Sequence, residues 1–231
     1  MSDTESFLYR FSFDHDDLVN YPWSHRYVTQ EEILRYLNHV ADEYDLRQYM
    51  QFETELLSAD WCEEEAAWKI QTTNGAFVAR YLVTALGLLS KQNFPDIPGL
   101  ASFQGQLTHT ASWKEDIVLK DKRVAVIGCR STGTQVVKAI ADEARSLHVF
   151  VRHPQYSVPS GNKPITPEYR QDINNRYKEI WEQVRNSQVA FGFEEVTRPV
   201  ISVSAEERVK VFEDLGLKAM DSDSCLAGSP S

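Results

Sequence analysis

The sequence has few cysteines and no excess of positive charge. Its 231 residues include three cysteines, Cys62, Cys129 and Cys225, with neither a CxxC pair nor Cys/His spacing. This argues against a disulfide framework and a zinc site, so no bound metal is predicted. Lysine and arginine number 24 against 34 aspartate and glutamate residues, which gives a formal net charge of −10. Because binding to a phosphate backbone needs a basic surface, nucleic acid is not expected as a partner.

Long apolar runs are also missing. No stretch approaches the ~20 apolar residues of a membrane span, so no membrane partner is expected. The first residues are acidic and polar, whereas a signal peptide begins basic and then turns apolar. With no disulfide pattern, a soluble cytoplasmic protein is predicted. The sequence is 42% hydrophobic and 25% charged, which suffices for one large globular domain or two small ones.

The first half of the chain predicts a helix followed by an antiparallel meander. Residues 7–13 are aromatic with imperfect alternation, which predicts an extended segment. After Thr29, apolar residues recur at helical spacing to about Tyr44. An Asn74-Gly75 pair is typical of a hairpin turn. Three short strands are expected, over residues 50–57, 67–72 and 77–84.

A strand, a glycine turn, a helix and a second strand follow one another in the middle of the chain. The strands are expected over residues 123–128 and 147–151, with a helix over 132–144 between them. This order is a βαβ unit, which belongs to a parallel sheet. The predicted fold class is therefore α/β.

The last part of the chain predicts helices. Residues 167–187 are charged and helical, and Ser204 with Glu207 forms a capping box before a helix over 205–215. The residues from 218 onward are small, polar and aperiodic, which predicts a disordered tail.

The turn of the βαβ unit reads Gly128-Cys-Arg-Ser-Thr-Gly133, where a dinucleotide-binding fold has GxGxxG. Arg130 replaces the middle glycine, which normally lets the backbone approach the pyrophosphate. The arginine either blocks the phosphates or pairs with them through its planar guanidinium. The alternative is a βαβ unit that binds nothing. The candidate nucleotide-binding residues here are Gly128, Arg130, Ser131, Thr132, Gly133 and Thr134.

Two basic residues follow the second strand of this unit. An NAD-specific fold carries an acidic residue there for the ribose 2′-hydroxyl, whereas Arg152 and His153 suit a 2′-phosphate. Any bound nucleotide is therefore predicted to be NADP.

The segment Phe103-Gln-Gly105-Gln-Leu-Thr-His109-Thr-Ala-Ser-Trp113, just before the βαβ unit, carries four residue types at fixed spacing. It resembles the FxGxxxHxxxW fingerprint of the Baeyer–Villiger monooxygenases, a branch of the flavin-dependent monooxygenases. The resemblance implies that NADPH reduces FAD and that oxygen from O2 is inserted next to a ketone carbonyl. It also implies that His109 and Trp113 couple two nucleotide domains rather than transfer protons.

The resemblance extends from about residue 2 to residue 215. It implies that Asp3 lies near the flavin and nicotinamide, that Tyr9 contacts FAD, and that the backbone of Leu56 lies by the FAD adenine. FAD and NADP(H) are thus the implied cofactors, and a ketone and O2 the implied substrates.

The same resemblance divides the chain into segments. It implies an incomplete FAD-binding domain over 1–115, a Rossmann-like NADP-binding segment over 116–160, a helical insertion over 161–217 and a tail over 218–231. It also implies a truncated member. A strand-GxGxxG-helix unit for the FAD pyrophosphate does not precede Asp3, and the family's catalytic arginine and C-terminal half lie beyond the last residue.

Two functions are therefore weighed. The first is a flavin-dependent monooxygenase of the Baeyer–Villiger type. The second is an inactive remnant that binds a nucleotide, a small molecule or a protein, and whose exposed apolar surface favours association. A serine or cysteine hydrolase has no nucleophile elbow to support it.

Overall fold

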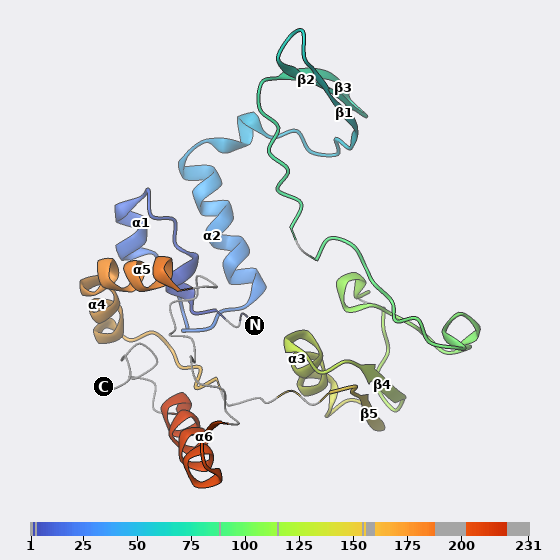
Figure 1. The fold of residues 1–231 in the computed structure, drawn as a ribbon, viewed down its shortest axis with the longest axis vertical. Helices are drawn as coiled ribbons and strands as arrows, with labels where there is room; N and C mark the ends of the chain where they lie inside the picture. The colour runs from blue at the N-terminus through green and yellow to red at the C-terminus, as the bar shows by residue number, and fades with distance from the viewer. Residues whose placement is uncertain are drawn as a thin grey trace. The chain divides into compact units, whose positions relative to one another are not determined.

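The fold consists of two compact units, whose elements are drawn in Figure 1. The computed structural model describes residues 2, 4–87, 89–114, 116–153, 155, 160–187 and 202–220. The first unit combines residues 1–40, 127–135 and 150–231, and the second combines 41–126 and 136–149. Helices, an antiparallel meander and a parallel two-stranded sheet confirm the predicted α/β class.

The first unit joins the N-terminal segment to two helices from late in the chain. Backbone bonds close this arrangement, because the Arg26 N–H donates to the Lys163 carbonyl at 3.1 Å and the Ile165 N–H to the Ser24 carbonyl at 2.9 Å. Its elements include η1 (Ser6–Tyr9), α1 (His15–Asn20), α2 (Gln30–Glu43), α4 (Pro167–Asn175) and α5 (Tyr177–Asn186).

Two apolar clusters form the core of this unit. The first joins Phe7 from η1 to the late helices, and the second joins Trp23 and Val28 to α2. Their buried members are Phe7, Ile173, Ile180 and Val184 in the first cluster, and Trp23, Val28, Tyr36 and Val40 in the second. The first unit is therefore held together by contacts between segments more than 100 residues apart in sequence.

The extended segment predicted over residues 7–13 is wrong at its start, where a 3-10 turn, η1, is found. The turn brings Phe7 and Arg10 to one side, and their exposed fractions are only 5% and 4%. Burial of residues three apart requires a helical turn rather than a strand, which accounts for the imperfect alternation.

The predicted helices are confirmed with changed ends. The helix expected after Thr29 is α2. The helical run 167–187 is interrupted at Arg176, whose φ of −97° and ψ of 10° separate α4 from α5. The last helix, α6 (Ala205–Met220), continues past residue 215, and the Ser204 Oγ accepts from the Glu207 N–H at 3.1 Å as the capping box predicts. Residues 221–231 lie outside the described residues.

The second unit contains the antiparallel meander β1 (Leu56–Cys62), β2 (Ala67–Thr72) and β3 (Gly75–Ala79), in that order. The strand over 67–72 and the Asn74-Gly75 turn are confirmed, and Gly75 has a φ of +136°. The strands expected over 50–57 and 77–84 are displaced toward the turns. The reason is cross-strand packing: Trp61 pairs with Trp68, with ring centroids 5.6 Å apart, and this extends β1 to Cys62.

One face of this meander is mostly apolar. The register places apolar side chains of all three strands on that face, and Trp61 and Phe77 are 43% and 40% exposed. Its apolar members are Ala59, Trp61, Trp68, Ile70, Phe77 and Ala79, and Thr72 is a polar member at the end of β2. Three short 3-10 turns complete the loops, namely η2 (Leu46–Tyr49), η3 (Leu100–Ser102) and η4 (Thr110–Ser112).

The predicted βαβ unit is confirmed. It consists of β4 (Arg123–Ile127), α3 (Ser131–Ile140) and β5 (Ser146–Phe150), with the two strands paired in a parallel sheet. The helix α3 ends four residues before the predicted end, because residues 141–143 form a turn that leads into β5. Among the helices of the described ranges, none has the length and apolar character to cross a membrane.

Candidate functional site

The glycine turn between β4 and α3 has the two backbone features for which glycine is needed. Gly128 has a φ of +105°, and its N–H donates to the Phe150 carbonyl of β5 at 2.9 Å. Gly133 has an ordinary φ, but a Cβ there would lie 2.4 Å from the Gly128 carbonyl oxygen. The first glycine is therefore required for its torsion and the last for close helix–strand packing.

Position 130 needs neither a positive φ nor the absence of a Cβ. Arg130 does not have a positive φ, and its side chain is exposed. Its carbonyl accepts the Thr134 N–H at 2.9 Å, which makes Arg130 the residue that precedes the first turn of α3. Arginine has no side-chain acceptor, so the Arg130 side chain does not cap the first N–H groups of α3, and groups of this kind can bind an anion.

The end of β5 lies against the glycine turn. The Cys129 Sγ donates to the His153 carbonyl at 3.4 Å, and the Thr134 Oγ1 donates to the Cys129 carbonyl at 3.1 Å. The structure thus brings together the two groups of predicted nucleotide-binding residues, with Arg130, Arg152 and His153 all exposed. An exposed arginine beside the amino end of a helix can bind a phosphate.

The FxGxxxHxxxW segment is ordered by contacts within itself. A Cβ on Gly105 would lie 2.5 Å from the Phe103 ring, so glycine lets that ring lie on the backbone. The His109 Nδ1 accepts the Ala111 N–H at 3.1 Å and caps η4, after which comes Trp113, 44% exposed. The His109 ring also packs edge-on against Phe94 at 5.2 Å. His109 therefore fixes a turn, and this segment lies in the second unit.

The predicted FAD residues do not belong to one unit. Asp3 lies outside the described residues. Tyr9 is half-buried against the Trp23 cluster of the first unit, and its hydroxyl lies 2.7 Å from the Ser2 Oγ. Leu56 begins β1 in the second unit and is 48% exposed.

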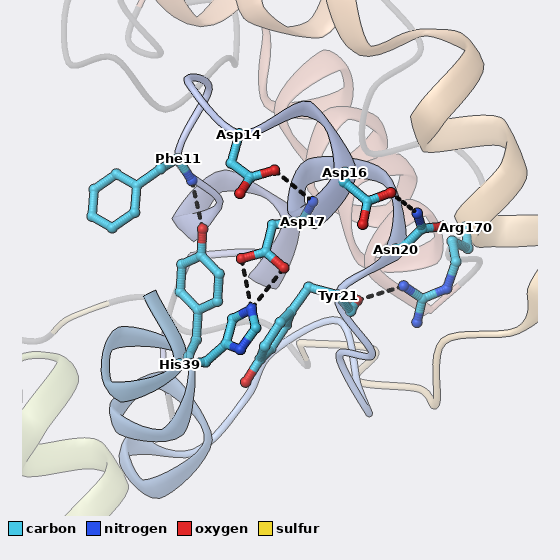
Figure 2. A network of polar contacts seen from close by, with 9 residues as sticks. Phe11, Asp14, Asp16, Asp17, Asn20, Tyr21, His39 and Arg170 are labelled. Atoms are coloured by element: carbon cyan, nitrogen blue, oxygen red, sulfur yellow. Dashed lines mark hydrogen bonds and ion pairs between the residues drawn. The ribbon is translucent and has the colours of Figure 1, made fainter. Parts of the chain in front are cut away.

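Sequence reasoning missed a polar network in the first unit, which Figure 2 shows. The His39 Nε2 of α2 lies 2.7 and 2.8 Å from the two carboxylate oxygens of Asp17 in α1. The ring centroids of Tyr21 and His39 are 5.4 Å apart. The backbone carbonyl of Tyr21 accepts a hydrogen bond from the Arg170 Nη1 of α4 at 2.5 Å. The only sequence signal for this network is Asp14, whose carboxylate caps α1 through the Asp17 N–H at 3.0 Å.

Metal chemistry receives no support from the described side chains, since they contain no group of three or more His, Cys, Asp or Glu residues that could hold an ion.

Comparison with known proteins assigns these features to one group. The sequence model of the flavin-binding monooxygenase-like family matches residues 11–168. A Baeyer–Villiger monooxygenase of Pseudooceanicola batsensis is 47% identical over 92% of this chain and 39% of its own length. A cyclohexanone 1,2-monooxygenase of an Acinetobacter species is 44% identical over the same shares.

The solved structures agree. The crystal structure of cyclohexanone monooxygenase from Rhodococcus sp. Phi1 bound to NADP+ is 53% identical and superposes with a TM-score of 0.78, over 92% of this chain and 40% of that one. The chain thus spans about two fifths of the length of the relatives it matches.

Proposed function

Because the chain belongs to the flavin-binding monooxygenase-like family, we propose that it acts in NADPH- and O2-dependent insertion of oxygen next to a ketone carbonyl. The observation that carries this proposal is the 47% identity to a Baeyer–Villiger monooxygenase across 92% of the chain. The ketone is favoured because the Acinetobacter relative is a cyclohexanone 1,2-monooxygenase.

The residues of the glycine turn fit the phosphates of NADP. Gly128 and Gly133 give the turn its shape, and the first N–H groups of α3, those of Ser131 and Thr132, hold the pyrophosphate. Arg152 and His153, beside the turn, hold the 2′-phosphate. When bound, NADPH supplies the hydride for flavin reduction, and the chain's own residues orient it.

His109 and Trp113 have a positioning role in this proposal. The His109 cap fixes η4, and Trp113 follows that turn at its end. In this proposal the turn couples the segment that binds one nucleotide to the segment that binds the other. Asp3, Tyr9 and Leu56 stay proposed FAD contacts.

The test is a titration of the purified chain with NADPH and FAD. Binding of NADPH is measured by nicotinamide fluorescence, and binding of FAD by protein-bound flavin absorbance after gel filtration. A chain that stays colourless and oxidises no NADPH in the presence of cyclohexanone contradicts oxygen insertion by this chain alone.

Two substitutions locate the nucleotide. Arg130→Gly is expected to raise NADPH affinity, because it clears the space through which the backbone approaches the pyrophosphate. Arg152→Ala is expected to weaken NADPH binding about tenfold, because a charge-assisted bond to the 2′-phosphate is lost, and to leave NADH binding unchanged.

The matched control is Arg145→Ala, which removes an exposed arginine outside the turn and the strand end. Its NADPH affinity should equal that of the unmodified chain. If neither Arg130→Gly nor Arg152→Ala changes binding, the glycine turn is not the nucleotide site.

A further inference from the structure

The guanidinium of Arg10 is buried in the first unit and only partly satisfied. Its Nε donates to the Phe7 carbonyl at 3.2 Å, and its Nη1 donates to the Leu18 carbonyl and to the Asn174 Oδ1, the latter at 3.1 Å. These three bonds use three of the five N–H groups of the side chain. The remaining group, Nη2, is buried without an acceptor among the described residues.

Helix α5 carries two more buried donors, which lie next to Arg10. The Arg10 guanidinium carbon is 5.8 Å from the Tyr177 ring centroid, and the Tyr177 and Trp181 ring centroids are 6.0 Å apart. Residues four apart share one face of a helix. The Tyr177 hydroxyl and the Trp181 Nε1, like the Arg10 Nη2, are buried with no hydrogen-bond partner in the described part of the chain.

Three adjacent orphaned donors are unusual, because nearly all buried polar atoms in native proteins have a partner. The indole and guanidinium groups can only donate, so a group that completes this cluster must be an acceptor.

The surroundings of these donors are positively charged and apolar. Burial lowers the pKa of Arg10 to about 10; among its neighbours Tyr177 acts to raise this pKa, and Arg170 acts to lower it. Burial raises the pKa of the Tyr177 hydroxyl, which therefore stays protonated as a donor near neutral pH, while Arg10 and Arg185 act on it as cations. The floor of the site is apolar, since Phe7, Ile180 and Trp181 belong to one core cluster.

We propose that Arg10, Tyr177 and Trp181 form a binding site for a carboxylate. The two unused N–H groups of the Arg10 Nη2 can donate to a carboxylate, and the Tyr177 hydroxyl and the Trp181 indole are further unpartnered donors beside it. A single negative charge compensates the buried Arg10. A phosphate or sulfate dianion fits less well, because the apolar floor makes burial of a second charge costly.

The carboxylate has two possible sources, a free carboxylate ion and a carboxyl side chain of a polypeptide. Both present the same group to the three donors. They differ in that only the free ion can be titrated into the site, whereas a side chain already in place loses its charge when the pH falls through the usual carboxyl range.

The indole N–H resonance of Trp181 reports on the site directly. In the 15N-labelled full chain, acetate is titrated against chloride at constant ionic strength and pH 7. A saturable shift of the Trp181 resonance is expected for the free ion. If a side chain fills the site, the resonance instead shifts between pH 3 and 6 without acetate. The resonances of Trp61 and Trp68, paired across β1 and β2, should stay in place in both titrations.

Two variants test the donors. Arg10→Met is expected to weaken the acetate response at least about tenfold, and Tyr177→Phe, which removes only the hydroxyl, about threefold to tenfold. Tyr177→Phe keeps the ring, so it serves where Arg10→Met fails to fold. Arg176→Met is the matched control, since its guanidinium pairs with Asp172 at 3.2 Å on the surface, and it should leave the response unchanged.

A Trp181 resonance that responds neither to acetate nor to pH overturns the proposal. So does a shift that rises without saturation, or one that persists in Tyr177→Phe and Arg10→Met, because such a shift reflects an adventitious ion only. None of these outcomes depends on whether the chain binds NADPH.

Discussion

The three motif positions of the glycine turn, 128, 130 and 133, have three different physical requirements. Gly128 needs a positive φ, Gly133 needs the absence of a Cβ, and position 130 needs neither. Arg130 is therefore compatible with the conformation of the turn and changes only what can approach it. A departure from a motif at such a position alters a binding surface without altering the fold.

The prediction at this scale concerns Gly133→Ala. Alanine favours a helix over glycine by up to about 1 kcal/mol, but its Cβ would lie 2.4 Å from the Gly128 carbonyl oxygen. Overpacking against a backbone atom costs about 1–3 kcal/mol, so the clash outweighs the helical preference. We expect a lower free energy of unfolding in urea and weaker NADPH binding.

Thr132→Ala, one residue earlier and exposed, is the control and should change the free energy of unfolding by less than about 0.5 kcal/mol. Equal stability of Gly133→Ala and the unmodified chain would mean that α3 and β4 do not approach each other so closely.

Some of these residue-scale features can be predicted from the sequence, and others cannot. The glycines were predictable because their chemistry is read from residue type alone. The burial of Arg10 was not, because its acceptors on Leu18 and Asn174 come from α1 and α4, and sequence spacing carries no information about that meeting.

The secondary-structure elements with strong local signals were the predictable ones. The helix α2 and the strand β2 carry regular periodicity, and their bounds agree with prediction. The strand β1 lies later in the sequence than the predicted strand, because its register depends on packing between Trp61 and Trp68 across the hairpin. The turn η1 replaces the start of the predicted extended segment, because Phe7 is buried by α4 and α5 rather than by a neighbouring strand.

The prediction for an element concerns the amino end of α4. The Thr166 Oγ1 accepts the Tyr169 N–H at 3.2 Å, and Pro167 occupies the first turn. Thr166→Ala removes this cap and should lower the free energy of unfolding by about 1 kcal/mol. The measurement is urea unfolding followed by tryptophan fluorescence.

Thr166→Ser keeps a hydroxyl at the cap and should retain most of the stability. A serine variant as unstable as the alanine variant would show that the threonine methyl group, not the cap, stabilises α4.

At the scale of the whole molecule, the first unit depends on a core shared by distant segments. Ile180 of α5 is 1% exposed and packs in one cluster with Phe7 of η1. Ile180→Ala is expected to cost about 2–5 kcal/mol. Because the cluster is shared, amides in residues 4–40 and 167–187 should lose hydrogen-exchange protection together.

Val209→Ala, at a 55% exposed position of α6, is the comparison and should leave protection unchanged. If Ile180→Ala speeds exchange in 167–187 but not in 4–40, the two segments are stable independently.

The predicted segment boundaries at residues 115, 160 and 217 remain predictions, and so does association of the chain through its exposed apolar side chains.

The backbone hydrogen bonds from Arg26 to Lys163 and from Ile165 to Ser24 also determine when the first unit can fold during protein synthesis. About 120 residues separate Val40 from Ser160, and at ~5–20 residues per second the ribosome needs roughly 10 s to translate them. During that interval residues 4–40 have been synthesised while α4 and α5 do not yet exist. Phe7 then lacks its buried partners Ile173, Ile180 and Val184, and the maturation of the first unit is coupled to the translation of α4 and α5.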